Sequence, residues 1–153
     1  MTRILVLGYG NTLRGDDALG PRAVERLRPL VFPAETLACH QLIPELAAQL
    51  AEYDAAIFVD AAAAGEPGTV HVRRLLPETQ TASLTHHVSP ATLLAMAHEL
   101  YGRAPQSLLV TAVGADFTLQ SSDEGPLSAA ATRALDEICR LLPQLVRDFP
   151  VGW

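Results

Sequence analysis

The sequence contains no lysine, and its positive charge is low. Eleven arginines stand against seventeen Asp and Glu residues, so the formal net charge is −6 with histidine neutral. Binding to nucleic-acid phosphates requires a basic face, and the chain has no basic cluster. We therefore predict no nucleic-acid partner.

Long apolar runs and cysteines are also scarce. No apolar stretch reaches the roughly 18 residues that a membrane-spanning helix needs, so we predict no membrane insertion. The first residues enter an apolar strand without a small-residue cleavage site, so we predict no secretory signal. The two cysteines, Cys39 and Cys139, form no Cys-x-x-Cys pair. These features predict a cytoplasmic protein with two reduced thiols.

The 153 residues, 49% of them hydrophobic, are enough for one domain with a sizeable core. Strand patterns alternate with helical patterns along the chain. This alternation predicts an α/β fold, a three-layer α/β/α sandwich with a twisted, mostly parallel sheet of about five strands. The predicted strands cover 3–8, 36–40, 55–60, 69–75 and 106–114, and the predicted helices begin near 19, 44, 90 and 126, the last ending before Pro143.

Functional sites in such sheets form at the carboxyl ends of the strands. That rule selects three loops, which contain Asp16 and Asp17, Asp60, and Asp116. Asp16 is expected to cap the helix that follows it. Asp17 and Asp60 are expected to lie close together, and two close carboxylates repel each other unless they share a proton or a cation.

A metal site built from these two acids would still need a nitrogen ligand for a borderline ion such as nickel or zinc. Three protein ligands would leave open positions, which suits an ion that arrives already partly coordinated. The candidate nitrogen ligands are His40, which follows a strand, His98, which falls inside a predicted helix, and the neighbours His86 and His87.

A phosphate-binding loop fits the sequence less well. The Gly8-x-Gly10 pair after the first strand resembles a dinucleotide-binding loop, but Leu13 stands where a third glycine belongs. Asp16 and Asp17 would also repel a phosphate.

A serine or cysteine hydrolase is also disfavoured. No Gly-x-Ser-x-Gly motif occurs, and the neighbours Cys39 and His40 would point to opposite faces of a strand.

The opening segment Gly8-Tyr-Gly-Asn-Thr-Leu-Arg-Gly-Asp-Asp-Ala-Leu-Gly20 resembles that of the [NiFe]-hydrogenase maturation proteases, peptidase family M52. The resemblance implies one hydrogenase maturation protease domain over 1–153, in a cytoplasmic endopeptidase. Such an enzyme removes the C-terminal extension from the precursor of a [NiFe]-hydrogenase large subunit after nickel insertion. The similarity continues in the same order through Ile57-Phe-Val-Asp-Ala61, Gly65-Glu-Pro-Gly68, Thr85-His-His-Val-Ser-Pro90 and Leu109-Val-Thr-Ala-Val-Gly114.

The resemblance also implies roles for particular residues. Asp17 and Asp60 are expected to be catalytic and, together with His87, to recognise nickel as its ligands. His86 is the alternative to His87. The nickel is expected to come with the substrate rather than to be held permanently by the protease.

The chain departs from the family pattern in two places. Some members carry a histidine directly after Ser-Pro, where this chain has Ala91. Some carry Asp-Gly-Gly after the second strand, where this chain has Cys39-His40-Gln41, so His40 is a candidate to replace that aspartate. Two alternatives stay open: a related α/β peptidase with a non-hydrogenase substrate, and a non-catalytic module that senses a metal or a nucleotide.

Overall fold

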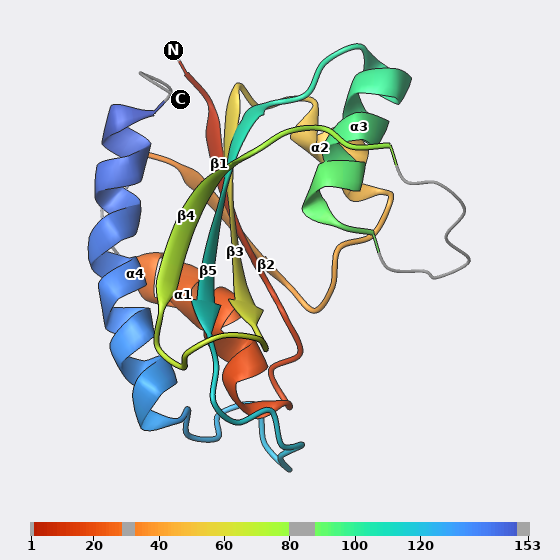
Figure 1. Cartoon of the computed structure of the whole chain (residues 1–153). Coiled ribbons are helices and arrows are strands. Elements are labelled where there is room, and N and C mark those ends of the chain that lie inside the picture. Colours follow the sequence, from red (N-terminus) through yellow and green to blue (C-terminus); the bar gives the residue numbers. More distant parts are fainter. Residues whose placement is uncertain (1, 29–32, 80–87, 150–153) are drawn as a thin grey trace.

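The computed structural model describes residues 2–28, 33–79 and 88–149 (Figure 1). These residues form five strands, four α-helices and one short 3₁₀ helix. The strands are β1 (Ile4–Tyr9), β2 (Glu35–Cys39), β3 (Ala55–Ala62), β4 (Val70–Leu75) and β5 (Gln106–Val113). The helices are η1 (Gly15–Ala18), α1 (Leu19–Leu27), α2 (Leu46–Leu50), α3 (Pro90–Tyr101) and α4 (Ala129–Asp148).

The strands form one sheet in the order β2-β1-β3-β5-β4. The first four strands in this order run parallel, and β4 pairs antiparallel with β5 at the edge. Helices α1 and α4 cover one face of the sheet, and α2 and α3 cover the other (Figure 1). The predicted three-layer α/β/α sandwich with a mostly parallel, five-stranded sheet is therefore confirmed.

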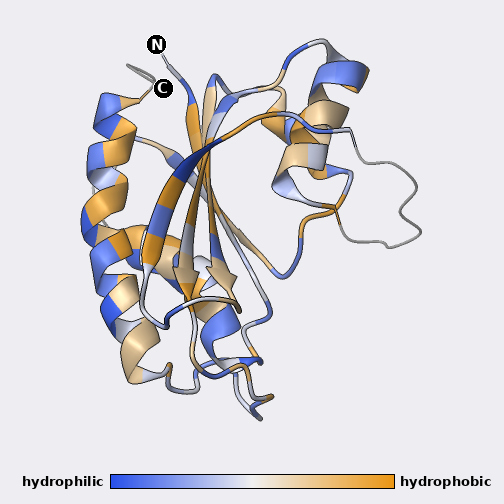
Figure 2. Cartoon of the chain, viewed as in Figure 1, coloured by the Kyte–Doolittle hydropathy of each residue, from blue (hydrophilic) through white to orange (hydrophobic). Residues whose placement is uncertain are grey.

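Strand β3 lies at the centre of the sheet and is buried on both faces. Its side chains alternate between two apolar cores: Ile57 and Val59 pack toward α1 and α4, and Phe58 packs toward α2 and α3. A strand covered on both faces reads as a continuous apolar run, as the first five residues of β3 do. Figure 2 shows hydrophobic residues along the strands and in alternating bands along α4, as an amphipathic helix requires.

The predicted end of the last helix before Pro143 is wrong. Helix α4 continues through Pro143 to Asp148. Proline inside a helix removes one backbone hydrogen bond and costs about 3 kcal/mol. Beyond it, however, Leu145 and Val146 are buried in the core. Burying a side chain of this size contributes roughly 1.5–3 kcal/mol, so packing on the sheet outweighs the local preference of proline.

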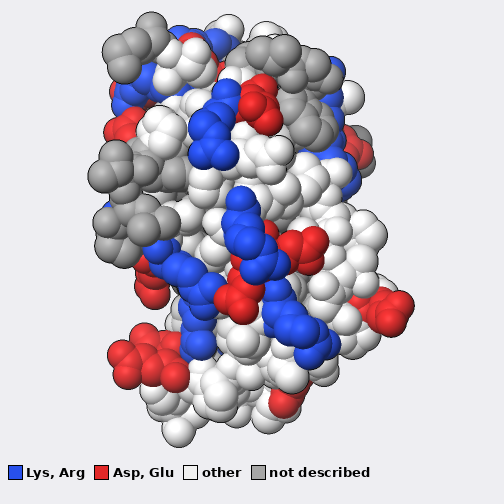
Figure 3. Space-filling model, turned by 90° about the vertical axis from the view of Figure 1, so that its left-hand side faces the viewer, with Lys and Arg blue, Asp and Glu red and all other residues white. Residues whose placement is uncertain are grey.

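The outer face of α4 mixes charges of both signs. Figure 3 shows arginines interleaved with carboxylates on this side of the molecule. The pair Arg26 and Asp136 joins α1 to α4 with a nitrogen–oxygen distance of 2.6 Å, and both side chains are about half exposed. Exposed pairs of this kind contribute little to stability, so this is a solvated surface.

A membrane-crossing helix would need to be both long and apolar. None of the helices among residues 2–28, 33–79 and 88–149 meets that requirement.

Candidate functional site

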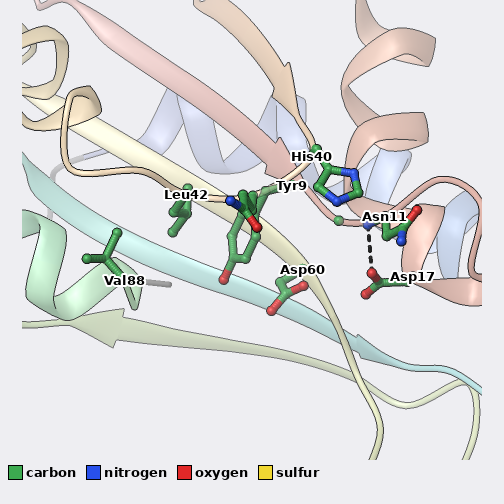
Figure 4. Close-up of a pocket in the computed structure, with 9 residues that line it drawn as sticks. Tyr9, Asn11, Asp17, His40, Leu42, Asp60 and Val88 are labelled. Carbon is green, nitrogen blue, oxygen red and sulfur yellow. Dashed lines mark hydrogen bonds between the residues drawn. The ribbon is translucent and has the colours of Figure 1, made fainter. Parts of the chain in front are cut away.

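A cleft of about 330 Å³ opens at the carboxyl ends of β1, β2 and β3 (Figure 4). This is the edge of the sheet at which the sequence predicted a site. The cleft brings together two acids, a histidine and a tyrosine, with apolar side chains on one wall. Its lining residues are Tyr9, Gly10, Asn11, Asp17, His40, Gln41, Leu42, Asp60 and Val88.

Asp17 reaches the cleft from η1, in the loop that follows β1. Its carboxylate accepts a hydrogen bond of 2.7 Å from the backbone N–H of Asn11 (Figure 4). Gly10 packs directly against the backbone carbonyl oxygen of Asp17, where a Cβ atom would overlap that oxygen. The turn therefore needs a glycine at this position, and it fixes where the Asp17 carboxylate lies.

Asp60 enters the cleft from the end of β3 and is half-buried. Its carboxylate accepts a hydrogen bond of 2.8 Å from the N–H of Ala61. Burial raises the pKa of Asp60 from 3.8 to about 6, hydrogen bonds from Tyr9 and Ala61 oppose the shift, and the charge of Asp17 adds to it. The two acids selected from the sequence therefore lie close enough to repel each other.

Tyr9 is a site residue that the sequence analysis missed. It ends β1, and in Figure 4 its hydroxyl lies beside Asp60. Burial raises the pKa of Tyr9 far above its ordinary value, and the charge and hydrogen-bonding oxygen of Asp60 raise it further. Tyr9 therefore stays protonated, and its hydroxyl is available to donate a hydrogen bond to Asp60. Its place at the carboxyl end of the first strand was the available signal.

We expect Asp60→Asn to stabilise the fold at pH 7, because burial disfavours the ionised carboxyl. Below the unfolded pKa near 3.8, Asp60 is neutral in both states and carries no penalty. As the pH rises to the folded pKa of about 6, the unfolded chain ionises first and the folded state loses stability. The variant should gain about 3 kcal/mol at pH 7 and almost nothing at pH 3.5. Urea unfolding at both pH values measures this, and an equal effect at both would contradict it.

The histidine candidates differ in where they lie relative to the cleft. His40 follows β2 and lines the cleft with Asp17 and Asp60. His98 lies exposed in the last turn of α3 and is not part of the cleft lining. The predicted ligand His87 and its alternative His86 lie outside the described residues. Within the described part of the chain, no three His, Cys, Asp or Glu side chains are grouped closely enough to hold a metal ion.

Asp16 does not cap the following helix, so that prediction is wrong. Neither η1 nor α1 has a side-chain cap. Asp16 is instead fully buried and accepts hydrogen bonds from the loop after β5 and from Ser128 at the start of α4. Burial alone would raise the pKa of Asp16, but the hydrogen bonds from Ser128, Ala115 and Asp116 lower it below its ordinary value. The two neighbouring aspartates thus have different environments.

The loop after β1 is poorly suited to cradle a phosphate. Several backbone N–H groups that would bind a phosphate already donate hydrogen bonds within the protein. Gly10 donates to the carbonyl of Cys39 at 3.1 Å, Asn11 to Asp17 at 2.7 Å, and Leu13 to the Asn11 side chain at 2.9 Å. The structure therefore agrees with the sequence in disfavouring a nucleotide site here.

The remaining candidates lie apart from the two acids. Asp116 is exposed, and its carboxylate accepts a hydrogen bond from the N–H of Thr118 at 2.9 Å. Cys39 and Cys139 are half-buried free thiols, and burial raises the pKa of each. A raised pKa disfavours the thiolate, so neither cysteine has the environment of a nucleophile.

Comparison with known proteins gives one consistent result. No protein-family model and no curated protein matches the sequence. Among solved structures, the chain is similar to the [NiFe] hydrogenase maturation protease HycI from Thermococcus kodakarensis KOD1, with 25% identity and a TM-score of 0.75 over 95% of this chain and 93% of that one. It is equally similar to the hydrogenase maturating endopeptidase HybD from E. coli, with 25% identity and a TM-score of 0.75 over 97% and 94% of the two chains.

A third similar structure is the hydrogenase 2 maturation peptidase from Thaumarchaeota archaeon SCGC_AB-539-E09. It has 22% identity and a TM-score of 0.68, over 94% of this chain and 97% of that one. The similarity to these proteins extends over nearly the whole of each chain. The resemblance read from the sequence motifs is therefore confirmed in the fold.

Proposed function

We propose that this chain is an endopeptidase that removes the C-terminal extension of a [NiFe]-hydrogenase large-subunit precursor after nickel insertion. Two sets of facts support the proposal. The structures it resembles at 25% identity are maturation endopeptidases. The observation that carries the assignment is the cleft itself, in which Asp17 and Asp60 meet at the carboxyl edge of the sheet.

Recognition of the substrate rests on the two carboxylates. With its pKa of about 6, Asp60 is mostly ionised at neutral pH despite its burial. A cation carried by the substrate would relieve the repulsion between Asp60 and Asp17. Oxygen donors from these acids and an imidazole nitrogen suit nickel that is already partly coordinated by the precursor. We assign the imidazole to His87, with His40 in the cleft as a further candidate.

Cleavage then follows from placement of the scissile peptide in the cleft. The substrate's nickel polarises the peptide carbonyl or lowers the pKa of a water molecule. One of the two acids, Asp17 or Asp60, accepts a proton from that water. The hydroxyl of Tyr9 keeps its proton beside Asp60, and a hydrogen bond from it orients the carboxylate.

Release also follows from the same recognition. Once the extension is removed, the substrate rearranges around its nickel. The positions on the nickel that the protease side chains occupied are then filled by the substrate, and the protease is released. A difference in affinity between the two substrate states gives both specificity and turnover. We propose that the reaction takes place in the cytoplasm, the location predicted from the sequence.

The test is a cleavage assay with the full chain and a purified, nickel-loaded large-subunit precursor. Mass spectrometry should find two products, the shortened large subunit and the released C-terminal peptide. Absence of cleavage would favour the non-catalytic alternative. Cleavage of unrelated proteins at a similar rate would favour a peptidase with another substrate.

A further inference from the structure

Asp16 is a fully buried carboxylate next to a proposed catalytic residue, yet it faces away from the cleft. One of its oxygens accepts hydrogen bonds from the N–H of Ala115 at 2.7 Å, the N–H of Asp116 at 3.0 Å and the hydroxyl of Ser128 at 2.7 Å. The other accepts from the N–H of Ser128 at 2.9 Å. A buried carboxylate with four donors is fully satisfied and strongly held.

These bonds join three segments that are distant in the sequence. The N–H of Asp16 also donates to the carbonyl of Asp116 at 2.8 Å, so the backbone is held as well as the side chain. Ser128 is the N-cap of α4, where its hydroxyl accepts from the N–H of Ala131 at 3.1 Å. Asp16 therefore fastens the loop after β1 to the loop after β5 and to the start of a twenty-residue helix.

Fixing Asp16 also fixes the direction of Asp17. Both residues lie in η1, a 3₁₀ helix, in which successive side chains are rotated by about 120°. With Asp16 held inside the protein, Asp17 is turned toward the cleft, where it accepts the hydrogen bond from Asn11 and lies near Asp60. The anchoring bonds of Asp16 do not touch the cleft, so they do not compete with substrate.

We propose that Asp16 is a positioning residue for the reaction: its four hydrogen bonds hold η1 so that the Asp17 carboxylate faces Asp60. This inference rests on the proposed function, because it assigns Asp17 to the reacting site. It concerns a residue that touches neither substrate nor the reacting atoms.

The test uses Asp16→Asn in the full chain, with two readouts. An amide at this position cannot accept all four bonds, because its NH₂ group would face a donor. The first readout is the amide proton of Asn11, which the bond to the Asp17 carboxylate shifts downfield. It should move upfield in an ¹⁵N–¹H spectrum recorded without substrate. The second is kcat/KM on the nickel-loaded precursor, which should fall on the order of 10–100-fold at a temperature where the variant is fully folded.

A matched control separates positioning from a general loss of stability. Leu142→Ala removes buried apolar atoms from α4, far from η1. It lowers the unfolding midpoint without touching the four hydrogen bonds of Asp16. It should leave the Asn11 resonance and kcat/KM unchanged while folded. Ser128→Ala removes one of the four bonds and keeps the carboxylate, so it should move both readouts in the same direction by a smaller amount.

Two results would overturn the inference. An unmoved Asn11 resonance in Asp16→Asn and Ser128→Ala would show that Asp16 does not set the place of Asp17. An active wild type with unchanged kcat/KM in both variants would show that the placement does not matter for the reaction. A wild-type chain that cleaves nothing would instead refute the proposed function. The Asn11 resonance would still report whether the hydrogen bonds of Asp16 position Asp17.

Discussion

Asp60→Asn and Asp17→Asn are each expected to lower the rate of precursor cleavage by on the order of 10²–10⁴-fold. Each change removes one of the two charges that meet in the cleft and leaves the side-chain shape almost intact. An amide is a poorer ligand for the substrate's nickel and cannot accept a proton from a water molecule. The measurement is kcat/KM on the nickel-loaded precursor.

Unfolding would not explain such a loss. The Asn side chain at position 17 can still accept the hydrogen bond from Asn11, and the change at position 60 should raise stability at pH 7. Asp116→Asn is the matched control, because it removes a charge at the same edge of the sheet and can keep the bond from Thr118. Retention of normal cleavage by Asp17→Asn or Asp60→Asn would show that the acid in question is not a site residue.

Gly8→Ala is expected to destabilise the protein by about 3–5 kcal/mol, a large part of the stability of a typical domain. Gly8 lies in β1 where α1 crosses it. A Cβ atom there would overlap the carbonyl oxygen of Gly20 and lie 2.7 Å from a methyl carbon of Val24. The obstacle is helix backbone, which cannot rotate away as a side chain could. Either the helix shifts from the sheet or the chain does not fold, and urea unfolding measures the difference.

Gly102→Ala is the control for this prediction. Gly102 ends α3 in the left-handed conformation with φ of +78°, and a Cβ atom there would meet nothing within 4 Å. The cost is then only that of the backbone conformation, about 1 kcal/mol. If Gly8→Ala proves no more destabilising than Gly102→Ala, the close contact between α1 and β1 is not as described.

The meeting of Asp17 and Asp60 could be predicted because parallel strands bring their carboxyl ends to one edge of a sheet. Asp60 follows an apolar run buried on both faces, and Asp17 follows the first strand by a short loop. Both facts are local in the sequence. The strand order then places β1 next to β3, so the two acids converge.

The role of Asp16 could not be predicted, because its partners lie 99 to 112 positions away in the chain. Nothing local distinguishes a carboxylate that caps its own helix from one that binds the start of another. The prediction that α4 ends before Pro143 failed for a related reason. The local preference of proline is visible in the sequence, whereas the packing of Leu145 and Val146 on the sheet depends on the tertiary structure.

The most direct test of the central claim compares one precursor preparation with and without its nickel. The full chain is incubated with both forms under the same conditions, and release of the C-terminal peptide is followed by mass spectrometry. Recognition of the substrate's nickel by Asp17 and Asp60 predicts rapid cleavage of the loaded form and almost none of the nickel-free form. Equal cleavage of the two forms would contradict the account.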